Sequence, residues 1–310
     1  MTKFVFDTQK DNKAKDSVVT IGTFDGVHIG HKVIIEKLKA KAKELKCESV
    51  IITFSPHPRT VVNKGNGVFL LTTLEEKKEL IKNLDVDKLY IIKFTKEFSK
   101  KTYQEFLTET IIKQNKAKHI IIGYDHKFGK DRAGDKTNLM ELAKENNIDI
   151  TIVNPQEVNG MVVSSTKIRD ALLNGNLELA NTLLGRNYKL NGTVVEGSKR
   201  GRTLGFPTAN IELSDPNKLL PQNGVYFVKV YLNNQKYFGI LNIGLRPTFN
   251  NRIEPIAEVH ILDFNENIYG KEISIEFVKR LRDEIKFDSK NELITQIKKD
   301  IKKVKEILNN

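Results

Sequence analysis

Short apolar runs rich in β-branched residues alternate with amphipathic stretches through the first half of the chain. The runs, which are typical of buried strands, lie at residues 18–21, 50–54, 89–92, 120–122 and 148–153. After the first run, an apolar stripe at helical spacing comprises Val33, Ile34, Leu38, Ala42 and Leu45. Strands that alternate with helices predict an α/β fold, a parallel sheet with helices on both faces.

Two polar patterns mark helix starts within this part. Thr73 with Glu76, and Thr102 with Glu105, have the spacing of a capping box, in which each side chain bonds the backbone N–H of the other residue. We therefore expect one helix to begin directly after each threonine.

The pattern changes after Gly185. Six β-rich segments, separated by Gly, Pro and Asn turns, lie at 188–195, 207–211, 224–232, 236–243, 257–262 and 272–277. Six strands with no helix between them predict a small antiparallel β-barrel. Ser289 and Glu292 then predict a C-terminal helix with an apolar face made of Leu293, Ile297, Ile301, Val304 and Leu308. The two patterns predict two domains, residues 1–184 and 185–310.

Composition narrows the class of protein. The 310 residues are 39% hydrophobic and 29% charged, which fits a globular protein rather than a disordered one. No run is apolar and long enough for a membrane span or a signal peptide. The single cysteine, Cys47, cannot form an internal disulfide. We expect a cytoplasmic protein without a membrane partner.

The net charge of +12 raises the possibility of nucleic-acid binding. The excess charge is spread over lysine-rich helical faces, such as residues 37–46 and 298–305, and no zinc-finger or RNA-binding motif accompanies it. We do not expect nucleic acid to be the main partner. A basic balance also suits an enzyme whose ligands carry several phosphates.

Residues 22–31 carry the most informative motif, Gly-x-Phe-Asp-Gly-x-His-x-Gly-His. It lies between a predicted strand and a predicted helix, where helix N–H groups and glycines favour a bound phosphate. His28 and His31 are three residues apart and project from the same side of the first helical turn. Zinc is a competing use of two histidines, but no further ligand motif accompanies them. The candidate nucleotide-binding residues here are Gly22, Phe24, Asp25, Gly26 and Gly30.

Three more polar clusters follow in the first domain. Ser55-Pro56-His57-Pro58 leaves the second strand, and the two prolines predict a rigid exit. Residues 123–135 contain Gly-x-Asp-x-x-Phe-Gly-x-x-Arg-x-Gly-Asp after the fourth strand. Ser164, Ser165 and Thr166 read as a hydroxyl-rich helix start, either a plain N-cap or a phosphate site, with Arg169 one turn later.

The order of these motifs resembles the adenylyltransferase half of bacterial bifunctional riboflavin kinase/FAD synthetases. The second half resembles the riboflavin kinase of the same family through residues 197–210, which read Gly-Ser-Lys-Arg-Gly-Arg-Thr-Leu-Gly-Phe-Pro-Thr-Ala-Asn. Asn223-Gly224-Val225-Tyr226, Asn242-Ile243-Gly244, Glu258-Val259-His260 and Phe287-Asp288-Ser289 follow in the family order. The resemblance extends from about residue 17 to the C-terminus. It implies a Rossmann-like nucleotidyltransferase domain followed by a six-stranded barrel domain with a C-terminal helix.

The resemblance implies an enzyme that phosphorylates riboflavin with ATP and then adenylylates FMN to FAD, releasing pyrophosphate. In adenylyl transfer, His28 and His31 would bond the α-phosphate, and Arg169 with Ser165 and Thr166 would hold the departing phosphates. The expected small-molecule partners are riboflavin, FMN, FAD and ATP, with Mg²⁺ as cofactor. We expect a monomer or a weak homo-oligomer.

In the kinase half, Glu258 is implied as the general base for the ribityl hydroxyl. Thr208 and Asn210, two residues apart on a predicted strand, would point to one face and hold Mg²⁺. Residues implied to cover the phosphates are Gly197, Lys199, Gly201 and Arg202. Residues implied to contact flavin are Phe54, Pro56, Asp125 and Phe128 in the first half, and Arg282 and Phe287 in the second.

His126-Lys127 departs from the family pattern, which usually has an aromatic residue followed by a basic one. One alternative is therefore an enzyme with an active kinase and an impaired adenylyltransferase. Another is a flavin- or RNA-binding regulator, but a pure binder has no need of both catalytic constellations.

Overall fold

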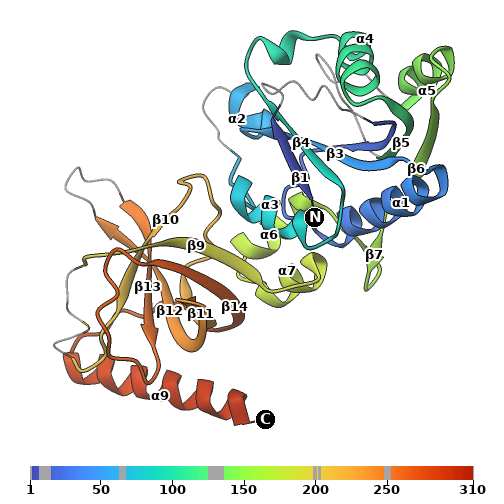
Figure 1. The fold of residues 1–310 in the computed structure, drawn as a ribbon. Coiled ribbons are helices and arrows are strands. Elements are labelled where there is room, and N and C mark those ends of the chain that lie inside the picture. Colours follow the sequence, from blue (N-terminus) through green and yellow to red (C-terminus); the bar gives the residue numbers. More distant parts are fainter. Residues whose placement is uncertain are drawn as a thin grey trace. The chain divides into compact units, whose positions relative to one another are not determined.

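The structure, a computed structural model, describes residues 2–6, 15–62, 68–124, 136–197, 201, 204–247 and 253–309. The chain divides into two compact units, Met1–Ser165 and Thr166–Asn310, each shown in Figure 1. The predicted domain boundary after residue 184 lies at the end of α7 (Leu177–Leu184) and stays a prediction.

A six-stranded parallel sheet forms the centre of the first unit. Its strands are β1 (Lys3–Phe6), β2 (Ser17–Ile21), β3 (Glu48–Ser55), β4 (Lys88–Lys93), β5 (Ala117–Gly123) and β6 (Asp149–Val153). They are ordered β1-β4-β3-β2-β5-β6, and each neighbouring pair is parallel. The predicted parallel sheet is confirmed. The edge strand β1 was not predicted, because four residues among charged neighbours are too few to show a period.

Helices cover both faces of this sheet, as predicted. They are α1 (Ile29–Leu45), α2 (Pro58–Val62), α3 (Leu74–Lys82), η1 (Phe98–Lys100), α4 (Tyr103–Glu105), η2 (Phe106–Gln114) and α5 (Lys136–Glu145). Both capping boxes form: Thr73 with Glu76 begins α3, and Thr102 with Glu105 begins α4. The α4 helix continues directly into η2, which has π-helical hydrogen bonding.

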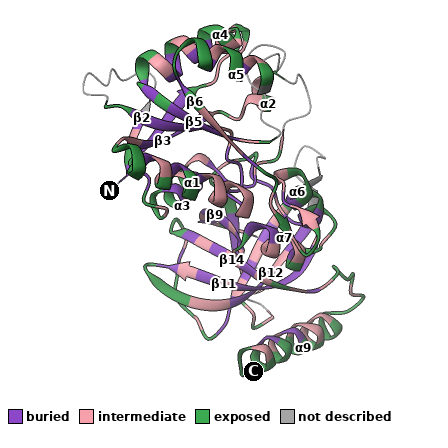
Figure 2. Cartoon of the chain, turned by 90° about the vertical axis from the view of Figure 1, so that its right-hand side faces the viewer, coloured by how far each residue is buried: buried purple, intermediate pink, exposed green. Residues whose placement is uncertain are grey.

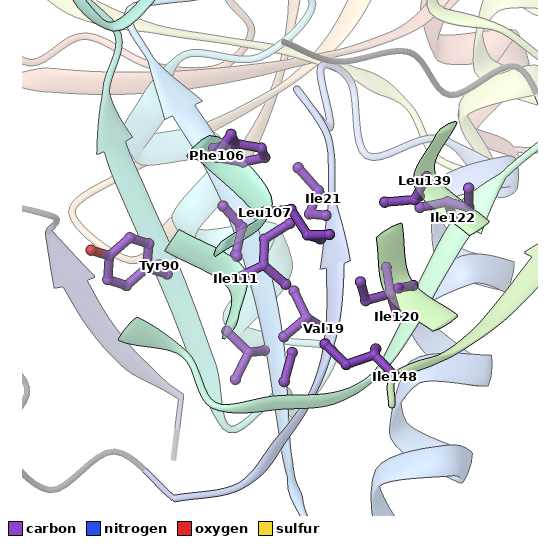
Figure 3. Packing of buried hydrophobic residues seen from close by; sticks show 14 of the residues in the cluster. Val19, Ile21, Tyr90, Phe106, Leu107, Ile111, Ile120, Ile122, Leu139 and Ile148 are labelled. Atoms are coloured by element: carbon purple, nitrogen blue, oxygen red, sulfur yellow. The ribbon is translucent and has the colours of Figure 1, made fainter. Parts of the chain in front are cut away.

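Successive residues of β2 point to opposite faces and so enter two separate hydrophobic clusters. Val18 packs in a cluster with Ile35 and Leu38 of α1. Val19 and Ile21 pack in the other cluster, which Figure 3 shows together with Phe106, Leu107 and Ile111 of η2 and Leu139 of α5. The central strand is buried on both sides, which explains its continuous apolar run.

The apolar stripe of α1 differs from the prediction at its edges. Ile35, Leu38 and Ala42 are its buried residues, whereas Leu45 is 42% exposed. Leu45 is the last residue of the helix, and Lys46 after it adopts a left-handed conformation that ends the helix.

The strand order also locates the place where a ligand fits best. From β2 the chain adds β3 and then β4 on one side, and returns to place β5 and β6 on the other side. In open parallel sheets, ligands bind beyond the carboxyl ends of the strands at such a reversal. The histidine motif follows the carboxyl end of β2 directly.

The second unit contains a closed antiparallel barrel. Its strands are β9 (Tyr188–Val195), β10 (Ala209–Leu213), β11 (Gly224–Leu232), β12 (Gln235–Pro247), β13 (Ile253–Ile261) and β14 (Glu272–Arg282), ordered β10-β13-β12-β11-β14-β9. The predicted six-stranded barrel is confirmed. A short hairpin of β7 (Glu157–Val158) and β8 (Met161–Val162) and the helices α6 (Ser165–Leu173) and α7 precede it.

The predicted C-terminal helix is present as α9 (Lys290–Asn309), and the N–H of Glu292 donates to the hydroxyl of Ser289 as expected. Val304 packs in a cluster with Phe227 of β11 and Leu281 of β14. Figure 2 shows that most of α9 is exposed or half-buried, and its buried residues are Asp300 and Val304. This helix therefore covers one outer patch of the barrel.

The second barrel strand begins two residues later than predicted, at Ala209 rather than at Pro207. Proline has no N–H to donate, and the carbonyl of Pro207 accepts from Nδ1 of His260 at 2.8 Å instead of entering the ladder. Thr208 therefore stands just before the strand. Within the part of the chain that the structure describes, no helix combines the length and the apolar character that crossing a membrane requires.

Candidate active sites

The first candidate site is the histidine turn, residues 22–31. His28 is the N-cap of α1, and its Nδ1 accepts from the backbone N–H of His31 at 3.3 Å. The two imidazole rings are stacked, with centroids 3.6 Å apart and an angle of 15° between the rings. The predicted spacing therefore brings both imidazoles together at the first turn of the helix.

The cap also decides which nitrogen of His28 carries the proton. Because Nδ1 is the acceptor, the proton of a neutral ring lies on Nε2, which is then a donor. A methyl group at Gly30 would lie 3.3 Å from the His28 ring, a tight approach that would press on the ring. Nε2 of His28 and the N–H groups at the N-terminus of α1 together favour a bound anion.

The buried carboxylate of Asp25 holds the histidine turn through hydrogen bonds. Its side chain is 1% exposed, and its carboxylate accepts from the backbone N–H of Leu71 and of Thr72, each at 3.0 Å. The Thr72 hydroxyl in turn accepts from the N–H of Gly26 at 3.0 Å. The Asp25 carboxylate thus binds the chain's own backbone, and its nucleotide contact stays a prediction.

The remaining residues of the turn are also held by the sheet and by one another. The N–H of Gly22 donates to the carbonyl of Ile52 at 3.0 Å. Phe24 is buried, and its ring centroid lies 5.0 Å from that of His31. The Phe24 ring thus packs against the His31 ring of the pair.

The hydroxyl-rich cluster lies at the start of α6, as predicted. The hydroxyl of Ser165, the first residue of α6, donates to the backbone carbonyl of Asp25 at 2.9 Å. This bond joins the helix start to the histidine turn. Ser164 precedes the helix, Thr166 is exposed and Arg169 is half-buried one turn later. Their phosphate contacts stay predictions.

The predicted flavin residues of the first half are placed only in part. Phe54, at the end of β3, belongs to an aromatic cluster with Phe94, Phe98 and Phe106. Pro56 is exposed. Asp125 and Phe128 lie outside the described residues.

The second candidate site is on three neighbouring strands of the barrel. In the antiparallel register, Asn210 of β10 lies opposite Glu258 of β13, and Glu258 lies opposite Asn242 of β12. Residues directly opposite each other share one face of a sheet. Val259 and Leu241, which alternate with them, are fully buried. The row Asn242–Glu258–Asn210 therefore lies on the outer face of the barrel.

The loop before β10 approaches this row closely. A side chain at Gly197 would overlap the amide of Asn210, and a methyl group at Gly201 would lie 3.1 Å from Oγ1 of Thr208. The backbone therefore passes directly over the two oxygen-bearing side chains predicted to hold Mg²⁺. One hydroxyl and one amide oxygen beside such a cradle fit a hard cation that phosphates also coordinate. Lys199 and Arg202 lie outside the described residues.

Two residues in or beside this row, Asn242 and His260, were quoted in family motifs without a role. Asn242 opposes Glu258, and His260 fixes the Pro207 carbonyl next to Thr208. The Phe206 ring contacts the His260 ring edge-on at 5.7 Å. Strand register brings these residues to the site, and register is not visible in the sequence of one strand. Among the residues that the structure describes, no cluster of three or more His, Cys, Asp or Glu side chains is arranged to bind a metal ion.

Arg282, predicted to contact flavin, has other partners in this structure. Its guanidinium donates to both carboxylate oxygens of Asp300 on α9, with Nε–Oδ1 and Nη2–Oδ2 distances of 3.2 and 2.8 Å. Gln296 also donates to Asp300, at 2.9 Å. Phe287 is half-buried in the segment that leads to α9. The flavin contacts of Arg282 and Phe287 stay predictions.

Comparison with known proteins matches both halves of the chain. Residues 10–167 match the FAD synthetase family, and residues 184–308 match the riboflavin kinase family. The bifunctional riboflavin kinase/FMN adenylyltransferase of Listeria monocytogenes is 40% identical over 286 residues, which are 92% of this chain and 90% of the relative. The Bacillus subtilis protein of the same name is 40% identical over 294 residues, 94% of this chain and 92% of the relative.

One solved structure is similar over nearly the whole chain. It is the crystal structure of a Streptococcus pneumoniae protein described as a macrolide-efflux protein, with a TM-score of 0.87 and 34% identity. The similarity covers 97% of this chain and 98% of that protein. Family matches in both halves and relatives that span nearly the whole length confirm the predicted resemblance. This chain belongs to the family of bifunctional riboflavin kinase/FMN adenylyltransferases.

Proposed function

We propose that the chain carries out both reactions of its family at the two sites described above. The barrel would phosphorylate riboflavin with ATP to FMN, and the first unit would adenylylate FMN with ATP to FAD and pyrophosphate. The observation that carries this proposal is the pair of constellations on one chain. One is the stacked His28–His31 pair at a helix start, and the other is the Asn242–Glu258–Asn210 row.

In adenylyl transfer, a phosphate oxygen of FMN attacks the α-phosphorus of ATP and pyrophosphate leaves. Both reactants are anionic, so the site must neutralise charge and hold the groups in line. Nε2 of His28 and the ring of His31 would donate to the α-phosphate, next to the N-terminus of α1. The hydroxyls of Ser165 and Thr166 with Arg169 would hold the departing β- and γ-phosphates.

In the kinase reaction, the 5′-hydroxyl of riboflavin attacks the γ-phosphorus and ADP leaves. Glu258 would accept the hydroxyl proton as the O–P bond forms. Asn210 stands directly opposite Glu258, so the base and one predicted metal ligand are neighbours. Thr208 and Asn210 would hold Mg²⁺, which would offset the charge of the ATP phosphates. The backbone at Gly197 and at Gly201 would lie next to those phosphates.

Each half provides a control for the other, so two single substitutions test the assignment. Purified protein is given riboflavin, ATP and Mg²⁺, or FMN, ATP and Mg²⁺, and the products are separated. Glu258→Gln should lower FMN formation by a factor on the order of 100 to 10,000 while FAD formation from added FMN is unchanged. His28→Ala should have the opposite effect and should lower turnover more than ATP affinity. Wild-type FMN formation by Glu258→Gln would refute the kinase assignment.

The same assay decides between the alternatives left open by the sequence. FAD formation from riboflavin supports two active sites, and FMN as the only product supports an active kinase with an impaired adenylyltransferase. Absence of both products supports a regulator. Our proposal also includes a cytoplasmic location and a monomeric or weakly associating chain, and sedimentation velocity over a range of protein concentrations tests the latter.

A further inference from the structure

Lys77 is a buried basic residue directly beneath the histidine turn. It lies on α3, where the Thr73–Glu76 capping box fixes the start of the helix, and it is 6% exposed. Lysine is rarely buried to this extent, because removing an ammonium from water is costly. A buried lysine therefore needs a reason for its place.

The ammonium of Lys77 holds the backbone of the turn. Nζ donates to the carbonyl of Thr23 at 2.6 Å, and Nζ also lies 3.4 Å from Oγ1 of Thr53. The Thr53 hydroxyl donates to the same carbonyl at 3.2 Å. Three elements, α3, the end of β3 and the histidine turn, thus meet at one carbonyl oxygen.

The turn has a conformation that needs such support. Phe24 and Val27 have φ values of 47° and 38°, a left-handed region that non-glycine residues rarely adopt, and Val27 is β-branched. Gly26 between them has φ of 86°. A backbone of this kind persists only where the surrounding contacts hold it.

Groups of opposite charge hold the strained segment at Thr23, which precedes it, and at Asp25, which lies within it. The Asp25 carboxylate binds the N–H groups of Leu71 and Thr72, and the Lys77 ammonium binds the Thr23 carbonyl. Burial lowers the pKa of Lys77 to about 8, and the Asp25 carboxylate opposes that shift. An apolar residue would fill this place without the cost of burying a charge. The contact that only the ammonium supplies is its bond to the Thr23 carbonyl.

We propose that Lys77 is a positioning residue for adenylyl transfer, which holds the Thr23 carbonyl so that the turn presents His28 and its N–H groups to the α-phosphate. In this role Lys77 acts through its bond to the turn and not as a ligand of the nucleotide. The inference rests on the proposed function, since it requires adenylyl transfer to take place at the histidine turn.

The test compares Lys77→Met, Lys77→Arg and the control Lys82→Met, which removes an exposed lysine from the last turn of the same helix. FAD formation from FMN and ATP gives kcat and the KM for ATP, and thermal unfolding reports the fold. Lys77→Met should lower kcat about 10- to 100-fold, the loss expected from misplacing groups by a fraction of an ångström to an ångström. The KM for ATP should change much less, Lys77→Arg should recover part of the loss, and Lys82→Met should match wild type.

A second variant keeps the test decisive if Lys77→Met does not fold. Thr53→Val removes the hydroxyl that bonds the Thr23 carbonyl but keeps the shape and charge of the site. It should lower kcat severalfold at an unchanged KM. Wild-type kcat in a folded Lys77→Met, or in Thr53→Val where Lys77→Met does not fold, overturns the inference. His28→Ala separates failure of the proposed function from failure of the inference about Lys77. If His28→Ala leaves FAD formation unchanged, the proposed function itself fails. If FAD formation is lost in His28→Ala but not in the Lys77 and Thr53 variants, only the role of Lys77 is rejected.

Discussion

Replacing Asp25 by alanine tests whether a buried carboxylate holds the histidine turn in place. In the wild type, the carboxylate accepts from two backbone N–H groups, those of Leu71 and Thr72, and from the Thr72 hydroxyl. Alanine leaves both buried N–H groups without this acceptor. Each such group costs about 1–3 kcal/mol, so Asp25→Ala should destabilise the first unit by about 2–6 kcal/mol. Set against a typical total of about 5–15 kcal/mol, this is a large fraction.

Asp25→Asn separates the hydrogen bonds from the packing. Asparagine has nearly the same shape, and its one oxygen can accept from both N–H groups as Oδ1 does, but its NH₂ group replaces Oδ2, which accepts from the N–H of Leu71 at 3.1 Å. We expect a smaller loss than with alanine. The control is Glu145→Ala at the exposed end of α5, which should change stability by no more than about 0.5 kcal/mol.

The assay must report on the first unit alone, because the chain has two compact units. Hydrogen exchange measured by mass spectrometry on peptides from β2, β3 and β5 gives the opening free energy of that unit. FMN formation by the barrel should stay at the wild-type rate. If Asp25→Ala changes the opening free energy by less than about 0.5 kcal/mol, the clamp does not hold the turn and our reasoning is wrong.

Three further predictions concern single contacts. Burial lowers the pKa of Lys77 from 10.5 to about 8, so between these values the unfolded chain holds more protons than the folded one. Raising the pH from about 8 to about 10 should therefore stabilise the wild type relative to Lys77→Met by up to about 1.4 kcal/mol per pH unit. Hydrogen exchange, corrected for its intrinsic pH dependence, measures this difference. An equal pH dependence of the stability of both proteins would contradict the prediction. Gly197→Ala places a methyl group where it overlaps the Asn210 amide, so it should abolish FMN formation while FAD formation from FMN continues. The product assay measures both rates. A normal kinase rate would show that Gly197 does not lie against Asn210. Asp300→Ala leaves the partly buried Arg282 guanidinium without its carboxylate and should lower the stability of the second unit by about 3–5 kcal/mol. The loss should appear as faster hydrogen exchange in α9. Protection equal to that of the wild type would show that the ion pair does not anchor the helix.

Local patterns allowed most of the secondary structure to be predicted. The capping boxes at Thr73 and Thr102, the β-branched runs and the six strands after Gly185 each depend on neighbouring residues alone. The strand β1 was missed because it is short and gains its stability from β4, far along the chain. The start of β10 was misplaced because Pro207 interrupts the ladder at a residue whose neighbours favour a strand.

The candidate sites were predictable only where their residues are close in sequence. The His28–His31 pair follows from helical spacing, and the structure confirms that the two rings meet. Asn242 and Lys77 were missed, because strand register and the packing of α3 bring them to their sites across long stretches of chain. The Arg282 side chain was expected to contact flavin, whereas in the structure it binds the buried Asp300, 18 residues later in α9. The sequence alone does not determine which face of α9 turns toward Arg282.

The closed barrel and the open sheet differ in how they meet other chains. Every strand of β10-β13-β12-β11-β14-β9 is paired on both sides, so its backbone offers no free rim to an extended peptide. The sheet of the first unit ends in β1 and β6, and β1 has only four residues. Loss of so short a border strand would uncover β4, whose Leu89, Ile91 and Ile92 are strongly apolar. Aggregation of this protein under mild denaturing conditions should therefore begin at β4, and a longer or better-anchored N-terminal strand should delay it.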